Sequence, residues 1–548
     1  MTVARAFGVA VVGVVGHIVE VEADLASGLP ALTLVGLPDT ALLESRDRLR
    51  AAVVNSGVAW PSRRITLNLS PASLPKAGSG FDLPLAGALL AAAEMVPAAG
   101  LARRVLVGEL GLDGQVRPVR GVLCAALAAA RSGRNRLVVA AVNAAEAGLV
   151  PAVTVECVHS LRGLLALLRG EPPGADGAWG EPLPTGAPRR VTSPGCLAGV
   201  SGVSGVSEAN LDAADAAPPD PTAAAVAVPD LRDVAGQPLA RRAVEVAAAG
   251  GHHLAVIGPP GAGKTMLAAR LPGLLPDLDR RSALEVTAVH SVAGILPPGS
   301  PLIVRPPFAD PHHTASVAAI VGGGSGLPRP GAASIAHRGV LLLDEAPEFG
   351  RGVLEALRQP LESGTITVHR AAGAVRFPAR FLLVIAANPC PCGAGGPRLC
   401  CTCPSTVRRR YLARLSGPLL DRVDLQISVE PVSVGALTDD TGLAEDSATV
   451  LTRVVAARAR TARRLAGTPW RTNADVPGAE LRRRFPISGP VLAPVRRLLQ
   501  IGALTARGHD RVLRIAWTLA DLAGEARPGP AQVAEALVLR GGSSGAAA

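Results

Sequence analysis

Leu254-Ala-Val-Ile-Gly-Pro-Pro-Gly-Ala-Gly-Lys-Thr265 is the stretch of this 548-residue sequence that decides its fold class. Its four apolar residues predict a buried strand, and residues 266–271 continue with helical spacing. A strand, a loop of the form G-x-x-x-x-G-K-T and a helix, in this order, form a P-loop. The sequence therefore predicts an α/β P-loop core.

The predicted loop supplies the groups that hold nucleotide phosphates. Its backbone N–H groups and the start of the following helix attract phosphate oxygens. Lys264 is expected to reach the β- and γ-phosphates, and the Thr265 hydroxyl to bind Mg²⁺. Lys264 is also one of only two lysines among 55 basic residues, which suits a site that needs a compact charge. The residues expected to bind ATP are Gly258, Pro259, Pro260, Gly261, Ala262, Gly263, Lys264, Thr265 and, from a later strand, Asp344.

Two later apolar runs end in polar side chains. Residues 339–343 lead into Asp344 and Glu345, and residues 381–387 lead into Asn388. Asp344 is expected to hold Mg²⁺ through water, and Glu345 to polarise the attacking water. Asn388 is suited to position that water against the γ-phosphate. The sequence thus predicts ATP hydrolysis, with Glu345 and Asn388 as catalytic residues.

Composition excludes several classes of protein. The chain is long enough for three or four domains, and its cores must be Ala/Val/Leu packing because only 2 % of the residues are aromatic. No apolar run reaches the 18 to 20 or so residues of a membrane span. Residues 7–15 are apolar but lack a cleavage site, so they predict a strand and not a signal peptide. We therefore expect a cytoplasmic protein without a membrane partner.

The formal net charge of +11 is unevenly distributed. Residues 451–514 contain 14 Arg against Asp475, Glu480 and Asp510, so the rest of the chain is near neutral. One interpretation is a polyanionic partner, bound through phosphate contacts because aromatic residues for base stacking are few. The alternative is a solvated, Arg-rich helical face.

The first part of the chain, residues 1–169, predicts a compact α+β domain. We expect strands at 9–24, 31–35, 64–69 and 137–141, helices at 40–56, 83–93 and 122–130, and a hairpin at 105–116. Residues 170–228 are rich in Pro, Gly, Ala and Ser and predict a flexible linker. The P-loop core follows at 229–435, and an Arg-rich helical lid at 436–548.

The loop Pro75-Lys-Ala-Gly-Ser-Gly-Phe-Asp82 and residues 108–125 resemble the proteolytic domain of Lon-type proteases. Aligned without gaps, the serine of that family falls on Gly80 and its lysine on Ala125; one deletion would recruit Ser79 instead. A Ser/Lys dyad needs an amine beside the hydroxyl, and no lysine exists outside Lys76 and Lys264. We therefore expect a catalytically dead, Lon-like domain with a structural or docking role.

The core resembles AAA+ ATPases, and Asn388 would correspond to their sensor 1 residue. The same resemblance implies functional roles for two arginines. Leu419-Leu-Asp-Arg-Val-Asp424 resembles the arginine-finger segment, so Arg422 is expected to reach the nucleotide of a neighbouring subunit in a ring, unless it is an ordinary surface residue. Residues 505–514 resemble the sensor 2 helix. Arg507 is the expected phosphate contact there, with Arg511 and Arg514 as alternatives one and two turns on.

Two insertions resemble those of the clade that contains magnesium chelatase and MCM helicases. Residues 294–331 correspond to the helix-2 insert and residues 364–377 to the pre-sensor hairpin, elements that line a central pore in that clade. His369, Arg370 and Arg376 would then face threaded DNA, unless the hairpin only braces the subunit interface. His312 and His313, in the insert, lack a second ligand pair at a metal-binding spacing.

Five of the eight cysteines lie within 14 residues, at Cys390, Cys392, Cys400, Cys401 and Cys403. Two C-x-C pairs can close around one tetrahedral Zn²⁺, with Cys390, Cys392, Cys401 and Cys403 as the best-spaced ligands and Cys400 as a spare. Redox pairing and unligated thiols remain alternatives. Cys124 and Cys157 are expected in cores.

Across almost its whole length, the chain resembles the ComM/YifB family of magnesium-chelatase-like AAA+ proteins. Residues 35–39, 78–84, 388–393 (Asn-Pro-Cys-Pro-Cys-Gly) and 416–422 carry this resemblance. It implies a hexameric, Mg²⁺- and ATP-dependent DNA translocase that promotes branch migration of recombination intermediates, in homologous recombination or natural transformation. Its partner would be single-stranded or branched DNA. Two alternatives remain, a motor subunit that inserts Mg²⁺ into a porphyrin and an ATPase that remodels polypeptides.

Overall fold

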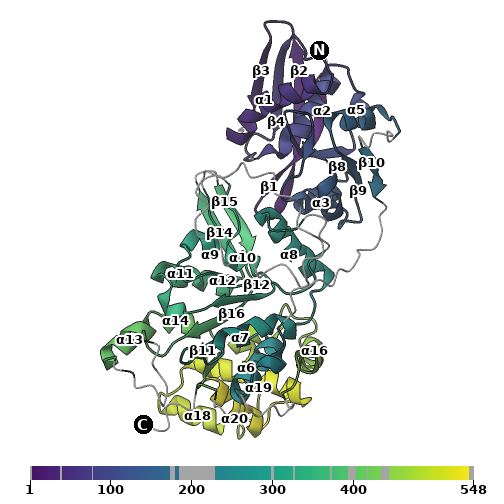
Figure 1. The fold of residues 1–548 in the computed structure, drawn as a ribbon. Helices are drawn as coiled ribbons and strands as arrows, with labels where there is room; N and C mark the ends of the chain where they lie inside the picture. The colour runs from purple at the N-terminus through teal and green to yellow at the C-terminus, as the bar shows by residue number, and fades with distance from the viewer. Residues whose placement is uncertain are drawn as a thin grey trace.

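The computed structural model describes residues 3–36, 40–76, 78–172, 179–183, 229–297, 302–324, 327–370, 373–392, 401, 403–415, 417–432 and 444–541. Figure 1 shows three regions along the long axis of the molecule. A sheet near the N-terminus lies at one end, the sheet that carries the P-loop lies in the middle, and C-terminal helices lie at the other end. Among the described residues, no helix combines the length and the apolar character that a membrane crossing requires.

The N-terminal region is built on an eight-stranded mixed sheet of order β10-β9-β8-β5-β1-β2-β4-β3. Its strands are β1 (Ala4–Val12), β2 (Val15–Ala26), β3 (Ala31–Val35), β4 (Arg64–Ser70), β5 (Arg104–Val107), β8 (Arg136–Ala140), β9 (Thr154–Val158) and β10 (Trp179–Leu183). The prediction of strand at 9–24 was incomplete, because β1 and β2 form an antiparallel hairpin that turns at Gly13. Gly13 has φ 64°, a conformation that favours glycine.

Three helices of this region lie near their predicted positions, namely α1 (Thr40–Asn55), α2 (Asp82–Ala92) and α3 (Val122–Arg131). Two more, α4 (Ala144–Ala147) and α5 (Leu161–Arg169), were not predicted. All of α2 is buried, as its Ala/Leu composition requires. The predicted hairpin at 105–116 was only partly right. Its first residues form β5 in the main sheet, and the hairpin itself joins β6 (Glu109–Leu110) to β7 (Val116–Arg117).

Part of the predicted linker is ordered. Strand β10 lies inside the 170–228 segment and pairs antiparallel with β9 at the edge of the sheet. The prediction treated this stretch as too rich in Pro and Gly for a strand, although a sheet edge tolerates such residues. Residues 173–178 and 184–228 lie outside the described residues, so the rest of the linker prediction is untested.

The P-loop lies at the end of a second sheet, in which all five strands are parallel. Its order is β12-β13-β16-β11-β17, with β11 (Leu254–Ile257), β12 (Phe308–Ala309), β13 (Val340–Leu343), β16 (Leu382–Ala387) and β17 (Leu425–Ser428). Strands β13 and β16 are wholly buried, as expected of continuous apolar strands covered on both faces. The helices around this sheet are α6 (Pro238–Gly250), α7 (Lys264–Arg270), α8 (Arg280–Ala293), α11 (Arg351–Ala356), α12 (Arg358–Ser363), α13 (Ser405–Ala413) and α14 (Gly417–Leu420).

An antiparallel hairpin projects from the P-loop region toward the N-terminal sheet (Figure 1). It consists of β14 (Thr365–Arg370) and β15 (Gly373–Pro378), as predicted. Beside it lie α9 (Val317–Val321), from the predicted insert, and α10 (Ala332–Ile335), which begins directly after that insert. The turn between β1 and β2 reaches this hairpin, since a side chain at Gly13 would meet the Arg376 carbonyl.

The N-terminal region also rests on α8. The Gly121 amide donates to the Ser291 hydroxyl at 2.9 Å, and that hydroxyl donates to the buried Glu146 carboxylate. At the other end of α8, Arg280 donates to the Leu149 carbonyl at 3.1 Å. Polar contacts at both ends of one helix therefore fix the N-terminal region on the P-loop region.

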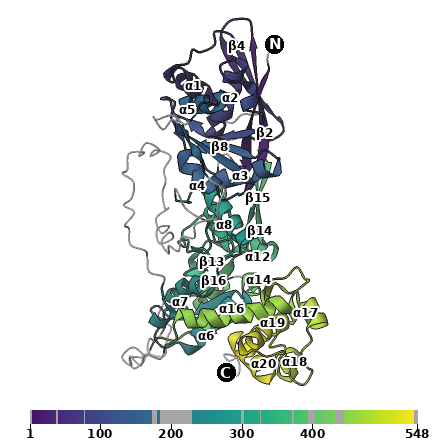
Figure 2. The ribbon, with the colours of Figure 1, turned by 90° about the vertical axis from the view of Figure 1, so that its right-hand side faces the viewer.

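The C-terminal region is helical, with α16 (Ser447–Arg464), α17 (Gly478–Arg484), α18 (Ala493–Gln500), α19 (Ala506–Ala523) and α20 (Pro530–Leu539). Figure 2 shows α16 lying across the molecule beside α6 and α19. Apolar residues of α16, α19 and α20 share one hydrophobic core with α6 and the P-loop sheet. A buried hydrogen-bond chain adds to this packing, because the His252 ring bonds Asp424 at 2.8 Å on one side and Thr518 at 2.7 Å on the other.

Candidate active site

The P-loop forms as its sequence predicts. Strand β11 ends at Ile257, and α7 begins at Lys264. Gly261 and Gly263 have φ 75° and 80°, in the left-handed region that glycine enters without strain. The loop therefore wraps tightly between strand and helix, as a backbone cradle for phosphate requires.

Lys264 lies at the centre of this cradle. Its ammonium donates to the carbonyls of Gly258 and Pro259, each at 2.8 Å, and to Oδ1 of Asn388 at 3.0 Å. Burial lowers the pKa of Lys264, while the nearby carboxylates of Asp344 and Glu345 act in the opposite direction.

Three parallel strands explain why these side chains meet. Ile257 of β11 is in register with Ala387 of β16, so Asn388 emerges beside Gly258. On its other side, β16 pairs with β13, which delivers Asp344 to the same edge. The Thr265 hydroxyl donates to Oδ2 of Asp344 at 2.7 Å. A hydroxyl and a carboxylate oxygen in contact form a donor set that suits Mg²⁺.

Glu345 has a partner that the sequence did not reveal. Nδ1 of His313 lies 3.3 Å from Oε2 of Glu345, which is half-exposed. The backbone of Glu345 is left-handed, with φ 49°, and turns the chain at the end of β13. His313 follows β12, the strand beside β13. From the sequence alone, His313 was considered only as a metal ligand. A contact across two parallel strand ends leaves no local signal in the sequence.

The two predicted arginines lie elsewhere in the same chain. Arg422 contacts the Glu362 carboxylate and the Pro418 carbonyl, and Arg507 is 3.4 Å from Oδ2 of Asp421. Among the described residues, neither arginine contacts the 258–265 loop. Arg507 is 74 % exposed, so this side chain is free to reach beyond its own chain.

The two alternatives to Arg507 are both occupied. Arg511 contacts the buried Asp424 and the Arg422 carbonyl, and Arg514 donates to the Val476 carbonyl at 2.8 Å. Burial alone would raise the pKa of Asp424, but the hydrogen bond and charge of His252 and the nearby arginines hold it below its usual range. Arg511 thus belongs to a buried network that joins α19 to the P-loop sheet.

A cavity of about 440 Å³ opens beside the start of α6. Val234 and Val450 line it together with charged side chains of α6, of α16 and of the segment before α16, which are Arg241, Arg242, Glu245, Glu445 and Arg453. Gln237, between the lining residues Gly236 and Pro238, donates to the carbonyl of the P-loop residue Ala262 at 3.5 Å. The cavity therefore adjoins the phosphate cradle, and no sequence pattern had indicated it.

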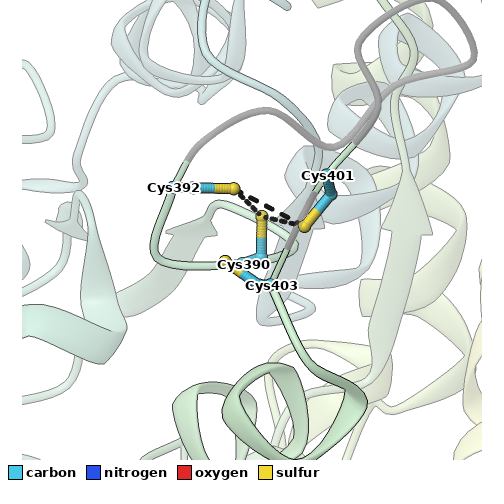
Figure 3. A group of neighbouring side chains, drawn as sticks. All are labelled: Cys390, Cys392, Cys401 and Cys403. Atoms are coloured by element: carbon cyan, nitrogen blue, oxygen red, sulfur yellow. Dashed lines mark hydrogen bonds between the residues drawn. The ribbon is translucent and has the colours of Figure 1, made fainter.

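The four expected zinc ligands come together (Figure 3). The sulfur atoms of Cys390, Cys392, Cys401 and Cys403 all lie within 4.8 Å of one another. Cys390 is buried and Cys392 is exposed. Cys400 lies outside the described residues. Cys124 and Cys157 are buried in the N-terminal core, as expected.

The Lon-like loop does not assemble a Ser/Lys pair. Nζ of the buried Lys76 donates to the carbonyls of Gly36, at 2.8 Å, and Pro71. The Ser79 hydroxyl donates to the Glu109 carboxylate instead. An amine that two carbonyls already engage is not placed to take a proton from Ser79, which is consistent with a dead peptidase site.

The predicted DNA-facing residues lie on the hairpin. His369 and Arg370 are exposed near the end of β14, and Arg376 of β15 donates to the Thr365 hydroxyl at 3.2 Å. A side chain added at Gly323 of the insert would come within 3.3 Å of the Arg370 guanidinium. Hairpin and insert therefore lie side by side.

The basic segment 451–514 is largely paired within the chain. Its arginines with carboxylate partners are Arg453, Arg464, Arg471, Arg482, Arg483, Arg484, Arg507, Arg511 and Arg514. Apart from Glu480 and Asp510, the partners come from outside the segment. Much of the local excess of positive charge is thus neutralised by the fold. By contrast, Arg408, Arg409 and Arg410 of α13 are exposed.

Comparisons with known proteins cover nearly the whole chain. Residues 230–437 match the family described as magnesium chelatase, subunit ChlI, residues 21–143 match subunit ChlI of Mg-chelatase, and residues 444–540 match the C-terminal part of that subunit. A part of the chain is also similar to Lon protease of Salinispora arenicola, with 31 % identity over 196 residues, 33 % of this chain and 25 % of that protein.

Three relatives match almost end to end. An uncharacterized protein of Mycobacterium tuberculosis is 52 % identical over 540 residues, 98 % of this chain and 99 % of its own. The uncharacterized protein YifB of Salmonella typhimurium is 41 % identical over 514 residues, 94 % of this chain and 92 % of its own. Competence protein ComM of Haemophilus influenzae is 39 % identical over 540 residues, 98 % of each chain.

Proposed function

This chain belongs to the ComM/YifB family of magnesium-chelatase-like proteins, and we propose that it is an ATP-driven motor that assembles into a ring, moves along DNA and promotes branch migration of recombination intermediates. One observation supports the proposed ATP hydrolysis. Lys264, Thr265, Asp344, Glu345 and Asn388 gather at one edge of a parallel sheet. They are the groups that ATP hydrolysis requires.

Each of these side chains has a separate task. The Lys264 ammonium exchanges its carbonyl partners for the β- and γ-phosphate oxygens. Thr265 and Asp344 would hold Mg²⁺, and the metal would supply positive charge against the charge that develops on the phosphates. Glu345 accepts a hydrogen bond from the attacking water and so orients it, with His313 fixing the carboxylate from the other side. Asn388 holds the water or the γ-phosphate in line.

The cavity beside α6 lies near the phosphate cradle, because the segment that lines it contacts the P-loop through Gln237. Much of its lining is charged, and Val234 and Val450 are only 4 % and 2 % exposed, so its position, more than an apolar surface, suits it to the base of a nucleotide. α16 forms part of its wall, so closure of the helical C-terminal region over this cavity would couple nucleotide binding to a movement of that region. We therefore propose that residues 436–548 act as the lid of the 229–435 core.

The positions of Arg422 and Arg507 support a ring. Arg422 pairs with Glu362 and Arg507 with Asp421. Among the described residues, neither arginine contacts the P-loop of its own chain. Arg507 is 74 % exposed and Arg422 21 %, and an arginine that lies away from its own P-loop is suited to serve the nucleotide of a neighbour. We infer that the site is completed at an interface between subunits, with six subunits as the expected number.

The DNA half of the proposal rests on the hairpin and the insert. His369 and Arg370 are exposed, and the hairpin that carries them lies beside the insert. Arg408, Arg409 and Arg410 add a second exposed cationic group. The basic segment 451–514 contributes less than its composition suggested, because carboxylates of the same chain pair with most of its arginines. The competence role named for the Haemophilus relative is consistent with DNA as the partner.

The family description favours one alternative, a motor subunit that drives Mg²⁺ insertion into a porphyrin. The near full-length relative ComM is named a competence protein, which favours DNA. A protease is not proposed, because Lys76 and Ser79 have separate partners. We propose that residues 1–169 dock the motor or a partner and have no peptidase activity.

A four-way DNA junction tests the proposal directly. Wild type with ATP and Mg²⁺ is expected to convert a labelled mobile junction into two duplexes, and Glu345→Gln to bind the junction without converting it. Conversion by the Glu345→Gln variant at the wild-type rate would contradict the proposal. So would ATP turnover by wild type that leaves the junction intact and responds only to a porphyrin or a polypeptide.

A further inference from the structure

The four clustered thiols lie between two parts of the proposed hydrolysis site. Cys390 follows Asn388 by two residues, at the end of β16, and Cys403 comes two residues before α13. The sulfur of Cys390 is 3.0 Å from that of Cys392 and 3.4 Å from that of Cys401, and the sulfurs of Cys392 and Cys401 are 3.5 Å apart. Figure 3 shows the four side chains converging on one point from separate stretches of backbone.

These distances favour a shared metal over a single disulfide, two of the alternatives that the sequence left open. A disulfide joins two sulfurs at about 2.05 Å and leaves the others apart. Four thiolates around one Zn²⁺, each about 2.3 Å from the metal, must lie about 3.8 Å from one another. All four sulfurs here lie within 4.8 Å of each other, and three of them are in mutual contact. The four sulfurs are therefore close enough together to ligate one metal ion.

We propose that Cys390, Cys392, Cys401 and Cys403 bind a single structural Zn²⁺, and that this metal holds Asn388 and Glu345 in position for hydrolysis. Four sulfur ligands favour zinc over Mg²⁺ or Ca²⁺, which prefer oxygen. A complete set of four protein ligands leaves no open position for a water, so the role is structural. The metal would therefore influence hydrolysis only indirectly, by fixing the backbone that carries Asn388 and Glu345.

α13 carries the link from the thiols to Glu345. The helix begins at Ser405, just after Cys403, and its Tyr411 is buried. At its end, Arg414 donates to the Pro347 carbonyl at 3.3 Å and to the Glu348 carboxylate at 3.4 Å. Pro347 and Glu348 belong to the turn that directly follows Glu345. A metal bound to Cys390 and Cys403 thus connects the strand end that carries Asn388 with the turn that carries Glu345.

The first test measures the metal itself and needs no activity. Full-length protein, purified without chelator, is expected to contain one zinc per chain by elemental analysis. Cobalt-substituted protein is expected to show the visible absorption of a tetrahedral thiolate site. Cys390→Ser and, at the exposed position, Cys392→Ser are each expected to lose the metal, whereas Cys157→Ala, a buried cysteine outside the cluster, is expected to retain it. Wild type without zinc, or a zinc content that neither serine variant changes, would overturn the proposal.

The second test concerns positioning, and it rests on the proposed ATPase activity. Cys392→Ser is expected to lower kcat for ATP by about tenfold, because catalytic groups tolerate little displacement, while KM stays near the wild-type value. A variant that lacks zinc but keeps the wild-type kcat would overturn the positioning role. If wild type itself does not hydrolyse ATP, the proposed function fails, and the zinc content still decides whether the metal site exists.

Discussion

The ammonium of Lys264 donates a hydrogen bond to Oδ1 of Asn388 across 3.0 Å, and so joins the phosphate-binding loop to the neighbouring strand. Lys264→Ala removes the cation and is expected to weaken ATP binding at least tenfold, because a charge-assisted contact to phosphate is lost. Asn388→Ala leaves that cation in place. It is expected to bind ATP within about threefold of wild type and to lose most turnover. Titration with a fluorescent ATP analogue, together with steady-state rates, separates the two effects, and equal losses of binding in both variants would contradict the assignment.

His313 and His312 form a matched pair of test positions. Their rings lie 4.1 Å apart, but His313 contacts Glu345, whereas His312 bonds Thr314 of its own loop. We expect His313→Ala to lower kcat about tenfold with KM for ATP unchanged, since Glu345 loses the group that orients it. His312→Ala serves as the control and is expected to stay within about twofold of wild type. The assignment fails if the two variants turn ATP over equally fast.

A mixing experiment tests whether Arg422 serves a neighbouring subunit. Lys264→Ala chains lack a working P-loop but keep both arginines. Arg422→Ala chains keep an intact P-loop but lack the arginine at position 422. Each variant alone is expected to retain under about 1 % of the wild-type rate, as removal of an arginine finger costs about 10³-fold or more. Mixed rings are expected to recover activity, because a complete site forms where the two kinds of chain meet. A rate of the mixture that equals the sum of the rates of the separate variants would show that Arg422 acts within its own chain.

Glu285 is expected to make a pH-dependent contribution to the free energy of unfolding. The His337 ring and the Arg338 guanidinium, 3.4 and 3.0 Å away, lower the pKa of Glu285 to about 2. Because the pKa of Glu285 is lower in the folded state than in the unfolded state, where it is near 4.5, the ionised carboxylate stabilises the folded protein at pH values above 4.5. This contribution is lost as the pH falls toward 2. Glu285→Gln is therefore expected to cost about 1 kcal/mol or less at pH 7, and less at pH 4.

The matched control for this prediction is Glu355→Gln. Glu355 pairs with Arg351, a side chain that is 88 % exposed, so its removal is expected to have little effect at either pH. Midpoints of urea unfolding at the two pH values provide the comparison. A Glu285→Gln penalty that grows as the pH falls would contradict a lowered pKa of Glu285 in the folded state.

The sequence predicts best where a local pattern determines the structure. The P-loop, β13 and β16 follow from apolar runs and glycine spacing, and the convergence of Asp344 and Asn388 follows from parallel strands. The hairpin at Gly13 escaped prediction, because Gly13 lies within a run of valines that otherwise indicates one continuous strand. Strand β10 escaped because pairing with β9 overrides a composition typical of linkers.

Partners that are distant in sequence account for the rest. The contact of His313 with Glu345 depends on which strands are neighbours in the sheet, which single-sequence patterns do not encode. Likewise, Arg511 and Arg514 are equivalent to Arg507 by helical spacing, and only the position of the buried Asp424 distinguishes them. The acidic partners of the basic segment come from several elements, so its charge could not be assessed from composition alone.

The most direct test of the central claim is the steady-state ATPase rate of wild type and Glu345→Gln, without DNA and with single-stranded, duplex and branched DNA, at low and high salt. We predict that DNA raises wild-type turnover, most with branched substrates, and that salt weakens the stimulation because phosphate contacts release counterions. Glu345→Gln is predicted to bind ATP and DNA with hardly any turnover. A wild-type rate that no DNA changes at either salt concentration would contradict a DNA motor.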